Sequence, residues 1–311
     1  MKERIWFNQL SVYIGERGNN LVNINKDIMI LVTGANGNLG SQAIDFLLKQ
    51  DPSEDIAGLV RSEEKGAELK KKGVEIRIGD YTDYASLQEA MQNVDTLLLI
   101  SSSSLEGRVQ QHKNVINAAE EAEVNHIFYT SIVHADEELS PLSPDHHETE
   151  NILKNAEIDS TIYRHTFYGE FLPMFLGDAL DTGEWYFPSG GQKINLALRS
   201  EMAEALANGL LSRDEHKDEV YEITSGQAYD LEEIADLISK ETGNDITYHD
   251  LSIADFQKNL EKAGLPDETI ALSTSVATTF VNGALNYTHD ALGKLLGREP
   301  AAIEDFLPEV V

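Results

Sequence analysis

The chain contains no cysteine and few basic residues. Without cysteine it cannot form disulfide bonds, use a thiolate nucleophile or build a zinc site on sulfur. Its 24 lysine and arginine residues are outnumbered by 54 aspartate and glutamate residues, and the formal net charge is −30. A field of this sign repels phosphate backbones and anionic lipid head groups. We therefore expect neither nucleic acid nor a membrane surface as a partner.

Long hydrophobic runs are also missing from the start of the chain. In residues 1–28 charged side chains prevent a continuous apolar run, at Glu3, Arg4, Glu16, Arg17 and Lys26. Such a segment fits neither a signal peptide nor a membrane span, so we expect a cytoplasmic protein. The first pattern typical of a buried strand begins at Met29. We interpret residues 1–28 as a loosely held N-terminal extension that is not part of the core.

The remaining residues alternate between short β-branched runs and helical patterns. We predict strands at ILVTG, DIAGLV, VEIRIG, DTLLLIS and HIFYTSI, with helices between them. This alternation predicts an α/β fold with a doubly wound parallel sheet. After about residue 166 the rhythm breaks, and longer helices alternate with isolated strands. We therefore predict a dinucleotide-binding domain over residues 29–185 and a smaller cap over residues 186–311, interwoven with it because no linker separates them.

A glycine-rich segment, TGANGNLG, follows the first predicted strand and precedes an amphipathic helix. Gly34 suits a tight turn, Gly37 lets the backbone approach a diphosphate, and Gly40 lets helix and strand pack closely. The free amides and the helix dipole then favour an anion. The segment predicts dinucleotide binding, while a glycine-rich turn without a ligand remains the alternative.

Residues after the next strands bear on which dinucleotide binds. A carboxylate after the second strand is typical of NAD sites, but this chain has Arg61 there, which suits the 2′-phosphate of NADP. A solvated surface arginine is the alternative, and Glu63 and Glu64 would oppose a phosphate if they pointed inward. Asp80, after the third strand, is placed to meet the adenine amino group or to form a simple turn.

Several separate segments together resemble one family. TGANGNLG, LVRSEEK, IGDYTD, LLLISSSS, HHETENIL and the tail NYTHDALGKLLGREP resemble the NmrA-like atypical short-chain dehydrogenases, and most closely their bacterial NADPH-dependent quinone oxidoreductases of type 2. The likeness runs from Met29 nearly to the C-terminus. It implies a Rossmann fold with a small α/β C-terminal cap, NADPH as cofactor without flavin or metal, and two-electron reduction of quinones.

The resemblance also implies a set of cofactor contacts. The family's contacts map to the glycine loop, to the arginine after the second strand, to the serines that end the fourth strand, and to a loop after the sixth strand. In this chain these residues are Gly34, Ala35, Asn36, Gly37, Asn38, Leu39, Arg61, Ser101, Ser102, Ser103, His165, Thr166, Phe167, Tyr168, Gly169 and Glu170.

The general acid of the wider superfamily is missing. That acid is a tyrosine with a lysine four residues later, and none of the eleven tyrosines has lysine at this spacing. Reduction of a ketone to an alcohol, or sugar epimerisation, is therefore disfavoured. HHETENIL places His147 and Asn151 in the same i, i+4 relation. The related reductases carry lysine where this chain has Asn151. We predict that Asn151 bonds the nicotinamide ribose and that His147 is a candidate for proton delivery.

Seven of the chain's 23 aromatic residues lie between Phe167 and Phe187. A quinone needs little acid catalysis, because hydride addition produces a delocalised hydroquinone anion. The enzyme must mainly stack the acceptor and exclude water, for which aromatic walls are suited. We predict that Tyr168 donates a hydrogen bond to the developing phenolate, while core packing is the alternative role for most of these rings.

The nine histidines do not predict a metal site. His146 and His147 are adjacent and diverge on a helix, so they cannot easily share one ion. His126 heads a buried strand and is interpreted as a satisfied structural residue, whereas His134 and His165 are predicted on loops at the ligand edge.

The leading hypothesis is therefore an NADPH-dependent reductase of quinones or similar flat, conjugated acceptors. A second hypothesis, from another class, is a catalytically silent NADP(H)-binding redox sensor that has a protein partner. A third is an isomerase or reductase of dye-like or plant-type aromatic compounds.

Overall fold

The computed structural model describes residues 29–104 and 106–311. The predicted extension over residues 1–28 lies outside the described residues.

The described chain forms strands and helices in alternation over its first half. The strands are β1 (Met29–Val32), β2 (Asp55–Val60), β3 (Glu75–Ile78), β4 (Thr96–Leu99), β5 (His126–Ile132), β6 (Asp159–His165), β7 (Phe167–Tyr168), β8 (Glu184–Phe187), β9 (Leu196–Ala197), β10 (Val220–Ile223) and β11 (Thr247–Asp250). The helices are α1 (Asn38–Gln50), α2 (Glu63–Lys71), α3 (Tyr84–Ala90), α4 (Arg108–Glu121), α5 (Ser143–Asn155), α6 (Leu172–Leu176), α7 (Ala179–Thr182), α8 (Arg199–Leu211), α9 (Leu231–Thr242), α10 (Ile253–Lys262), α11 (Asp267–Val281), α12 (Ala291–Leu296) and α13 (Ile303–Val310). Short 3-10 turns η1 (Ala135–Glu137), η2 (Gly169–Phe171) and η3 (Arg213–Glu215) connect some of them.

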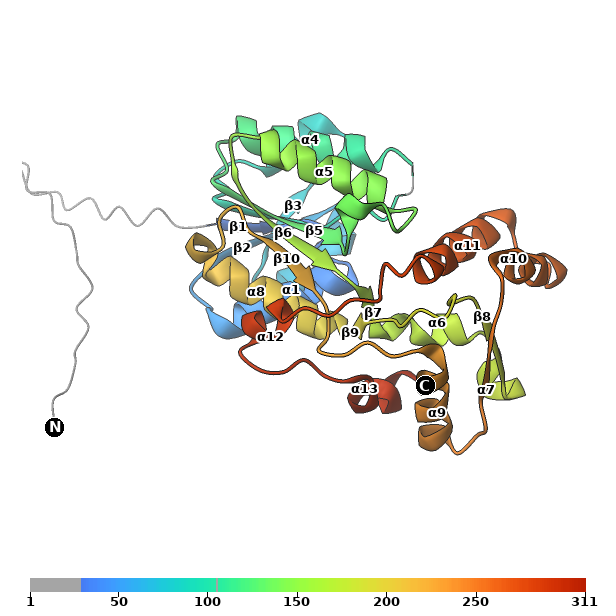
Figure 1. Ribbon diagram of the computed structural model, residues 1–311. Helices are drawn as coiled ribbons and strands as arrows, with labels where there is room; N and C mark the ends of the chain where they lie inside the picture. The colour runs from blue at the N-terminus through green and yellow to red at the C-terminus, as the bar shows by residue number, and fades with distance from the viewer. Residues whose placement is uncertain (1–28, 105) are drawn as a thin grey trace, which may run out of the picture.

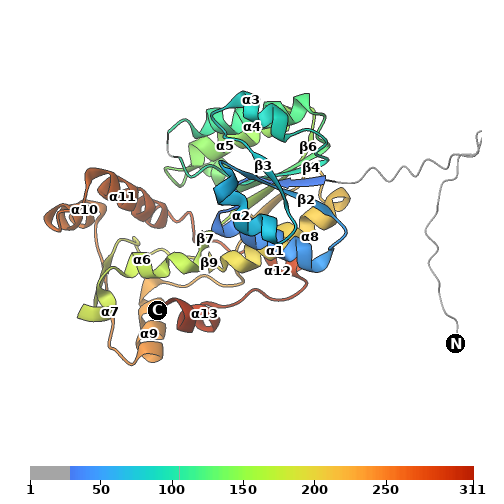
Figure 2. The same ribbon diagram turned by 180° about the vertical axis from the view of Figure 1, so that it is seen from behind.

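Seven strands form one sheet in the order β10-β6-β5-β4-β1-β2-β3, and every neighbouring pair is parallel. Helices α3, α4 and α5 cover one face, and α1, α2, α8 and α12 cover the other (Figures 1 and 2). This arrangement confirms the predicted doubly wound parallel sheet. The strand order reverses between β1 and β4, and ligands of such sheets bind outside the carboxyl ends of the strands at this point.

The central strands are recognisable in the sequence because both of their faces are buried. All seven residues of β5 are buried, as are the four residues of β4. Helices on both faces remove the polar alternation that marks a half-exposed strand, so such strands read as continuous apolar or β-branched runs. The segment DSTIYRH forms β6, which ends at His165. His165 is therefore the last residue of the strand. The prediction that it lies on a loop is wrong.

The second lobe is built around its own hydrophobic cluster. Phe175, Trp185, Phe187 and Phe280 are among its buried residues, and α6, α9, α11 and α13 contribute to it. Two small parallel pairs, β8 with β11 and β7 with β9, belong to this part of the chain. Figure 1 shows this lobe beside the carboxyl ends of the large sheet.

Segments from after residue 186 pack against the large sheet. Helix α8 packs along α1, and β10 pairs with β6 at the edge of the large sheet, although both come from the region after residue 186. The chain therefore leaves the sheet after β6, returns to it, and leaves again. The division at residues 185 and 186 stays a prediction.

Within the part of the chain that the structure describes, no helix combines the length and the apolar character needed to cross a bilayer.

Candidate functional site

The glycine loop between β1 and α1 has the geometry that its sequence predicts. Gly34 adopts φ +57°, in the left-handed region that favours glycine, and its carbonyl accepts a hydrogen bond of 2.9 Å from the Gly37 amide. A Cβ atom at position 40 would lie only 2.5 Å from the Gly34 oxygen. The turn is therefore compact, and helix α1 begins directly against it.

The first turn of α1 offers free amides to a ligand. Gly37 is its N-cap and has no side chain to bond them, and the turn contains no acidic residue. The amides of Asn38, Leu39 and Gly40 precede the first possible intrahelical bond and so lack a partner within the helix. Gly34, Asn36, Gly37 and Asn38 are exposed, while Ala35 and Leu39 are buried. These residues fit the diphosphate of a dinucleotide.

Two side chains outside the predicted site, Thr33 and Tyr81, hold the base of this loop against the end of β4. Thr33 Oγ1 donates to the Leu98 carbonyl at 3.0 Å and accepts from the Ile100 amide at 2.9 Å, which ties β1 to β4. The Tyr81 hydroxyl lies 2.5 Å from Thr33 Oγ1 and 2.9 Å from the Ile100 carbonyl oxygen. No local sequence pattern points to this contact, because Tyr81 lies far from Thr33 in the chain.

Arg61 and Asp80 lie near each other after β2 and β3. Arg61 is exposed, and its charge helps to hold the pKa of Asp80 below its usual value. The larger causes are hydrogen bonds from Thr82, whose hydroxyl and amide lie 2.6 and 2.8 Å from Asp80 Oδ1. Asp80 thus forms the turn that we gave as the alternative, and one of its carboxylate oxygens is engaged there.

The serine run after β4 is positioned by a buried histidine. The Ser102 amide donates to His112 Nε2 at 2.8 Å, so His112 carries its proton on Nδ1 and donates to Thr149 Oγ1 at 2.9 Å. Burial, together with the charge of Arg108, lowers the pKa of His112 to about 3. The neutral ring therefore links α4, α5 and the end of β4.

The three predicted serines are not equivalent. The Ser102 hydroxyl donates to Gln111 at 2.5 Å, and the Ser101 amide donates to Thr130 Oγ1 at 2.9 Å. Ser103 is exposed. The side chain of Ser103 is thus more available to a ligand than that of Ser102, and the Ser101 hydroxyl accepts only a long bond of 3.5 Å from Thr130.

His147 and Asn151 lie on one side of α5, as their spacing predicts. Together with Asp136 and Arg164 they line a hollow of about 730 Å³ between α5 and the β6–β10 edge of the sheet. The lining of this hollow includes no residue of the glycine loop or the serine run. The roles predicted for His147 and Asn151 therefore stay predictions.

Next to this hollow, a buried charge network crosses the sheet. Arg164 on β6 donates to Glu150 at 2.6 and 3.0 Å, to Asp136 at 2.8 Å and to Glu222 at 2.9 Å. Ser131 donates to Glu150 at 2.6 Å. Burial disfavours the charge of Arg164, yet its hydrogen bonds to Glu150 and Glu222 raise its pKa above the ordinary value. The network links α5 to three neighbouring strands.

The segment predicted to contact the nicotinamide begins inside the protein. His165 is buried, its Nε2 has no hydrogen-bond partner, and desolvation lowers its pKa to about 3. Thr166 donates to the Asn195 carbonyl at 2.7 Å. A Cβ atom at Gly169 would lie 2.7 Å from the Phe306 ring. These residues pack the two lobes together, and their predicted cofactor contacts stay predictions.

The side chain of Arg199 stacks on two aromatic rings of the neighbouring segment, those of Tyr168 and Phe171. The guanidinium carbon of Arg199 lies 4.6 Å from the centroid of Tyr168 and 5.6 Å from that of Phe171. The carboxylate of Glu170 accepts from the backbone amide of Arg199 at 3.2 Å and so caps α8. Arg199 is not among the predicted site residues, because a lone arginine at the start of a helix carries no distinguishing signal.

The predicted aromatic wall divides into two groups. Phe175, Trp185 and Phe187 are buried in the second lobe, the role that we gave as the alternative. Phe167 and Tyr168 are half-buried, whereas Phe171 and Tyr186 are 36% and 49% exposed. Phe167 packs against the cluster of the second lobe and Tyr168 against the cluster beneath the glycine loop, so these two rings lie where the lobes meet.

Two further histidines occupy their predicted positions. His126 begins β5 and bonds Thr161 Oγ1 at 2.7 Å through Nε2, although its buried Nδ1 has no partner. It is thus only partly satisfied. His134 lies on the loop after β5 and packs edge-on against Tyr287.

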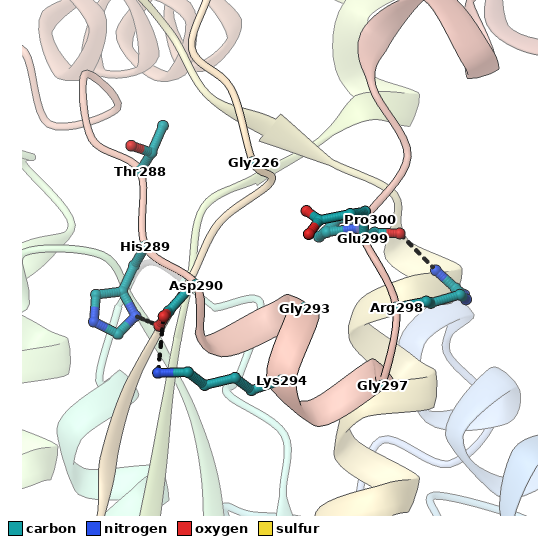
Figure 3. A pocket seen from close by; sticks show the side chains of 10 residues that line it. All are labelled: Gly226, Thr288, His289, Asp290, Gly293, Lys294, Gly297, Arg298, Glu299 and Pro300. Carbon is teal, nitrogen blue, oxygen red and sulfur yellow. Dashed lines mark hydrogen bonds and ion pairs between the residues drawn. The ribbon is translucent and has the colours of Figure 1, made fainter.

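A second hollow lies beside α12 (Figure 3). Its volume is about 660 Å³, and Lys294 points toward Asp290 with 2.8 Å between the charged atoms. Its lining comes from Gly226 and from the chain between Thr288 and Pro300, and it includes none of the predicted site residues.

Comparison with known proteins places this geometry in a family. The pattern of the NmrA-like family matches residues 26–307. The chain belongs to the NmrA-like family. Among members similar to it, quinone oxidoreductase 2 of Escherichia coli (strain K12) is 37% identical over 277 residues, which are 89% of this chain and 96% of the relative.

Solved structures agree with this assignment to the NmrA-like family. A crystal structure of the NADPH-dependent quinone oxidoreductase of Escherichia coli complexed with NADPH has a TM-score of 0.86 at 36% identity, and the match covers 91% of this chain and 99% of that one. Triphenylmethane reductase of Citrobacter sp., complexed with NADP(H), has a TM-score of 0.84 at 31% identity, with 91% and 100% covered. NmrA, a negative transcriptional regulator, in complex with NADP has a TM-score of 0.73 at 15% identity over 92% of this chain and 95% of that one, which shows the fold alone.

Proposed function

We propose that this protein is an NADPH-dependent oxidoreductase that transfers a hydride to quinones or to similar flat, conjugated acceptors. The observation that supports this most is the free first turn of α1 behind Gly34 and Gly37, in a chain that is 37% identical to a quinone oxidoreductase over nearly all of its length. We place the reaction in the cytoplasm, and it needs neither a flavin nor a metal.

The chain's own residues divide the work of binding. The glycine loop from Gly34 to Leu39 holds the diphosphate, with the free amides of Asn38 and Leu39 as donors, and Arg61 holds the 2′-phosphate. Asp80 and the serines Ser101 to Ser103 position the adenosine and the nicotinamide half, and Asn151 bonds the ribose. The segment from His165 to Glu170 shapes the pocket. When bound, NADPH supplies a hydride, and thus the two electrons of the reduction.

Reduction of the acceptor depends on how the site orients the acceptor ring and excludes water. Phe167 and Tyr168, at the junction of the two lobes, provide flat surfaces for a conjugated ring. Desolvation raises the pKa of Tyr168 to about 12, so its hydroxyl stays protonated and can donate to an acceptor oxygen. His147 is the second proposed source of a proton.

The function is tested by following NADPH absorbance with benzoquinones and naphthoquinones. We expect oxidation that depends on the acceptor. Tight NADPH binding without turnover of any acceptor would discard the proposal. Comparison of Tyr168→Phe with His147→Gln then separates the two proton donors, because only the true donor lowers kcat with little change in the dissociation constant of NADPH.

One observation favours the alternative, a catalytically silent NADP(H)-binding redox sensor. The family resemblance implies that Asn151 stands where the related reductases have lysine, and in this sequence no tyrosine is followed four residues later by lysine. A sensor would bind its protein partner differently with NADP and with NADPH and would turn over no acceptor. Pull-down with each nucleotide state measures the first property, and the absorbance assay measures the second.

A further inference from the structure

Arg199 presents a positive charge without a carboxylate partner. Among residues 29–104 and 106–311, no acidic oxygen lies within 4.0 Å of its guanidinium, although most arginines of the chain have such a partner. The carboxylate of Glu170 accepts from the backbone amide of Arg199, and Glu201, two residues further along the chain, pairs with Arg298. The guanidinium instead stacks on Tyr168 and Phe171.

The fold fixes this cation at the junction of the lobes. Parallel pairing of β7 with β9 sets Tyr168 opposite Ala197, and α8 begins two residues later with Arg199. Tyr168 packs against the cluster that contains Ala35 and Leu39 of the glycine loop. Figure 1 shows β7, β9 and the start of α8 together at the carboxyl end of the sheet. The charge therefore lies on the side of the molecule where the glycine loop opens.

Beside the Arg199 guanidinium, Tyr168 offers a hydrogen-bond donor. The hydroxyl of Tyr168 makes no hydrogen bond to another described side chain, and its ring is held between Arg199 on one side and Phe171 at a centroid distance of 5.4 Å. A fixed cation and a free phenol side by side suit an oxygen atom that gains negative charge.

We propose that Arg199, together with Tyr168, selects the acceptor by charge: quinones that are neutral or carry an acidic substituent are favoured, and cationic dyes are disfavoured. This inference rests on the proposed reductase function. A neutral quinone that gains a hydride becomes a hydroquinone monoanion, NADPH is oxidised to NADP, and a proton, delivered by Tyr168 or His147 and replaced from solvent, completes the hydroquinone. The guanidinium stabilises the anion. A cationic acceptor becomes neutral on reduction and, before that, is repelled by Arg199.

A preference for anionic acceptors is opposed by the charge of the whole molecule. A net charge of −30 attracts cations from a distance, so a preference for anionic acceptors would have to arise locally. A preference for anionic acceptors that disappears when Arg199 is replaced can therefore be assigned to this one residue.

The test compares three acceptors: 1,4-naphthoquinone, 1,2-naphthoquinone-4-sulfonate and crystal violet, a cationic dye. Arg199→Met keeps an unbranched side chain that can cover the rings and removes the charge, and Arg199→Lys keeps a charge with a poorer stack. Lys258→Met is the matched control, because it removes one exposed charge on α10. We expect Arg199→Met to lower kcat/KM for the sulfonate about tenfold relative to crystal violet, and Arg199→Lys to lower it less. The control should leave this ratio unchanged.

A binding measurement separates this inference from the proposed function. Calorimetry with naphthalene-1-sulfonate, which cannot be reduced, is carried out on the NADP-loaded protein and its Arg199→Met variant. We expect binding about tenfold weaker in the variant, with an unchanged dissociation constant for NADPH. Binding of the sulfonate that depends on Arg199, without turnover of any acceptor, would retain the charge selection and reject the reductase. Equal sulfonate binding in both proteins, or a loss of NADPH affinity that accounts for the whole effect, would overturn the inference.

Discussion

Position 40 has room for a hydrogen atom and for nothing larger. A Cβ there would lie 2.5 Å from the Gly34 oxygen and 3.1 Å from the Ala35 Cα. We expect Gly40→Ala to displace α1 from β1, to lower the free energy of unfolding by about 1–3 kcal/mol, and to weaken NADPH binding at least about tenfold. Fluorescence titration and urea unfolding measure the two effects. Gly226→Ala is the control, since the nearest atom to its added Cβ lies 3.9 Å away and neither quantity should change.

Arg61 is the residue on which the choice between NADPH and NADH depends. A guanidinium bonds a phosphate with an energy of about 1.5–3 kcal/mol, which corresponds to roughly a tenfold to hundredfold change in affinity. We expect Arg61→Gln to weaken NADPH binding by that factor and to leave NADH binding nearly unchanged. Lys65→Gln, a neighbouring exposed charge on α2, should affect neither nucleotide selectively. Equal loss for both nucleotides would contradict the assignment of Arg61 to the 2′-phosphate.

His112 makes stability depend on pH. Its pKa in the folded protein is about 3, below the ordinary value of roughly 6.5, so below that pH the unfolded chain takes up a proton that the folded chain does not. Stability is therefore complete above about pH 6.5 and falls as the pH decreases toward 3, by up to about 1.4 kcal/mol per unit.

We expect His112→Gln, whose amide oxygen can still accept from Ser102, to lose less stability between pH 7.5 and pH 5 than the parent protein. Urea unfolding midpoints at both pH values measure the difference. A steeper fall in the His112→Gln variant would refute the argument.

At the level of residues, the sequence predicted contacts within one segment better than contacts across the sheet. Gly34, Gly37 and Gly40 act on one another over seven positions, so their spacing carries the information. The contacts of His112 with Ser102 and of Tyr81 with Thr33 depend on which strands become neighbours, and no local pattern encodes this. Arg199 is found only once β7 and β9 are seen to pair.

Among the elements, α5 and β6 share a buried ion network whose removal should be costly. The side chains of Arg164 and Glu150 are only 11% and 8% exposed. We expect Glu150→Gln to lower the free energy of unfolding by about 2 kcal/mol, less than the roughly 3–5 typical of a broken buried pair, because Asp136 and Glu222 still face Arg164. Asp255→Asn, in an exposed pair with Lys258, should cost less than about 0.5 kcal/mol. Denaturant unfolding measures both, and equal costs would show that the network adds nothing.

Long, buried strands could be predicted from the sequence, and very short strands could not. The strands β4, β5 and β6 lie inside the sheet and read as apolar or β-branched runs. Strands β7 and β9 have two residues each, too few for any periodicity, and exist because the two lobes meet there. His165 was misplaced on a loop for the related reason that a polar residue at a strand end resembles the start of a loop.

For the whole molecule, interweaving predicts that the first half cannot fold without the second. Ala203, Leu206 and Leu210 of α8 are fully buried in the same cluster as Ile44 and Leu47 of α1. We expect a chain that ends at residue 185 to expose this apolar face, to bind a hydrophobic dye and to lose cooperative unfolding. A truncated chain that unfolds cooperatively and binds NADPH would instead support residues 29–185 as an independent domain. The full-length chain is the control.

Asn195 is fully buried and ties together segments that cross between the lobes. Its side chain donates to the carbonyls of Ser225 and Gln227 and accepts from the Ser225 amide, while its backbone bonds Leu285 and Thr166. A hinge along this line would have to break these bonds together. Because these bonds resist such a motion, we expect the association of an acceptor to follow simple second-order kinetics without a slow closing step.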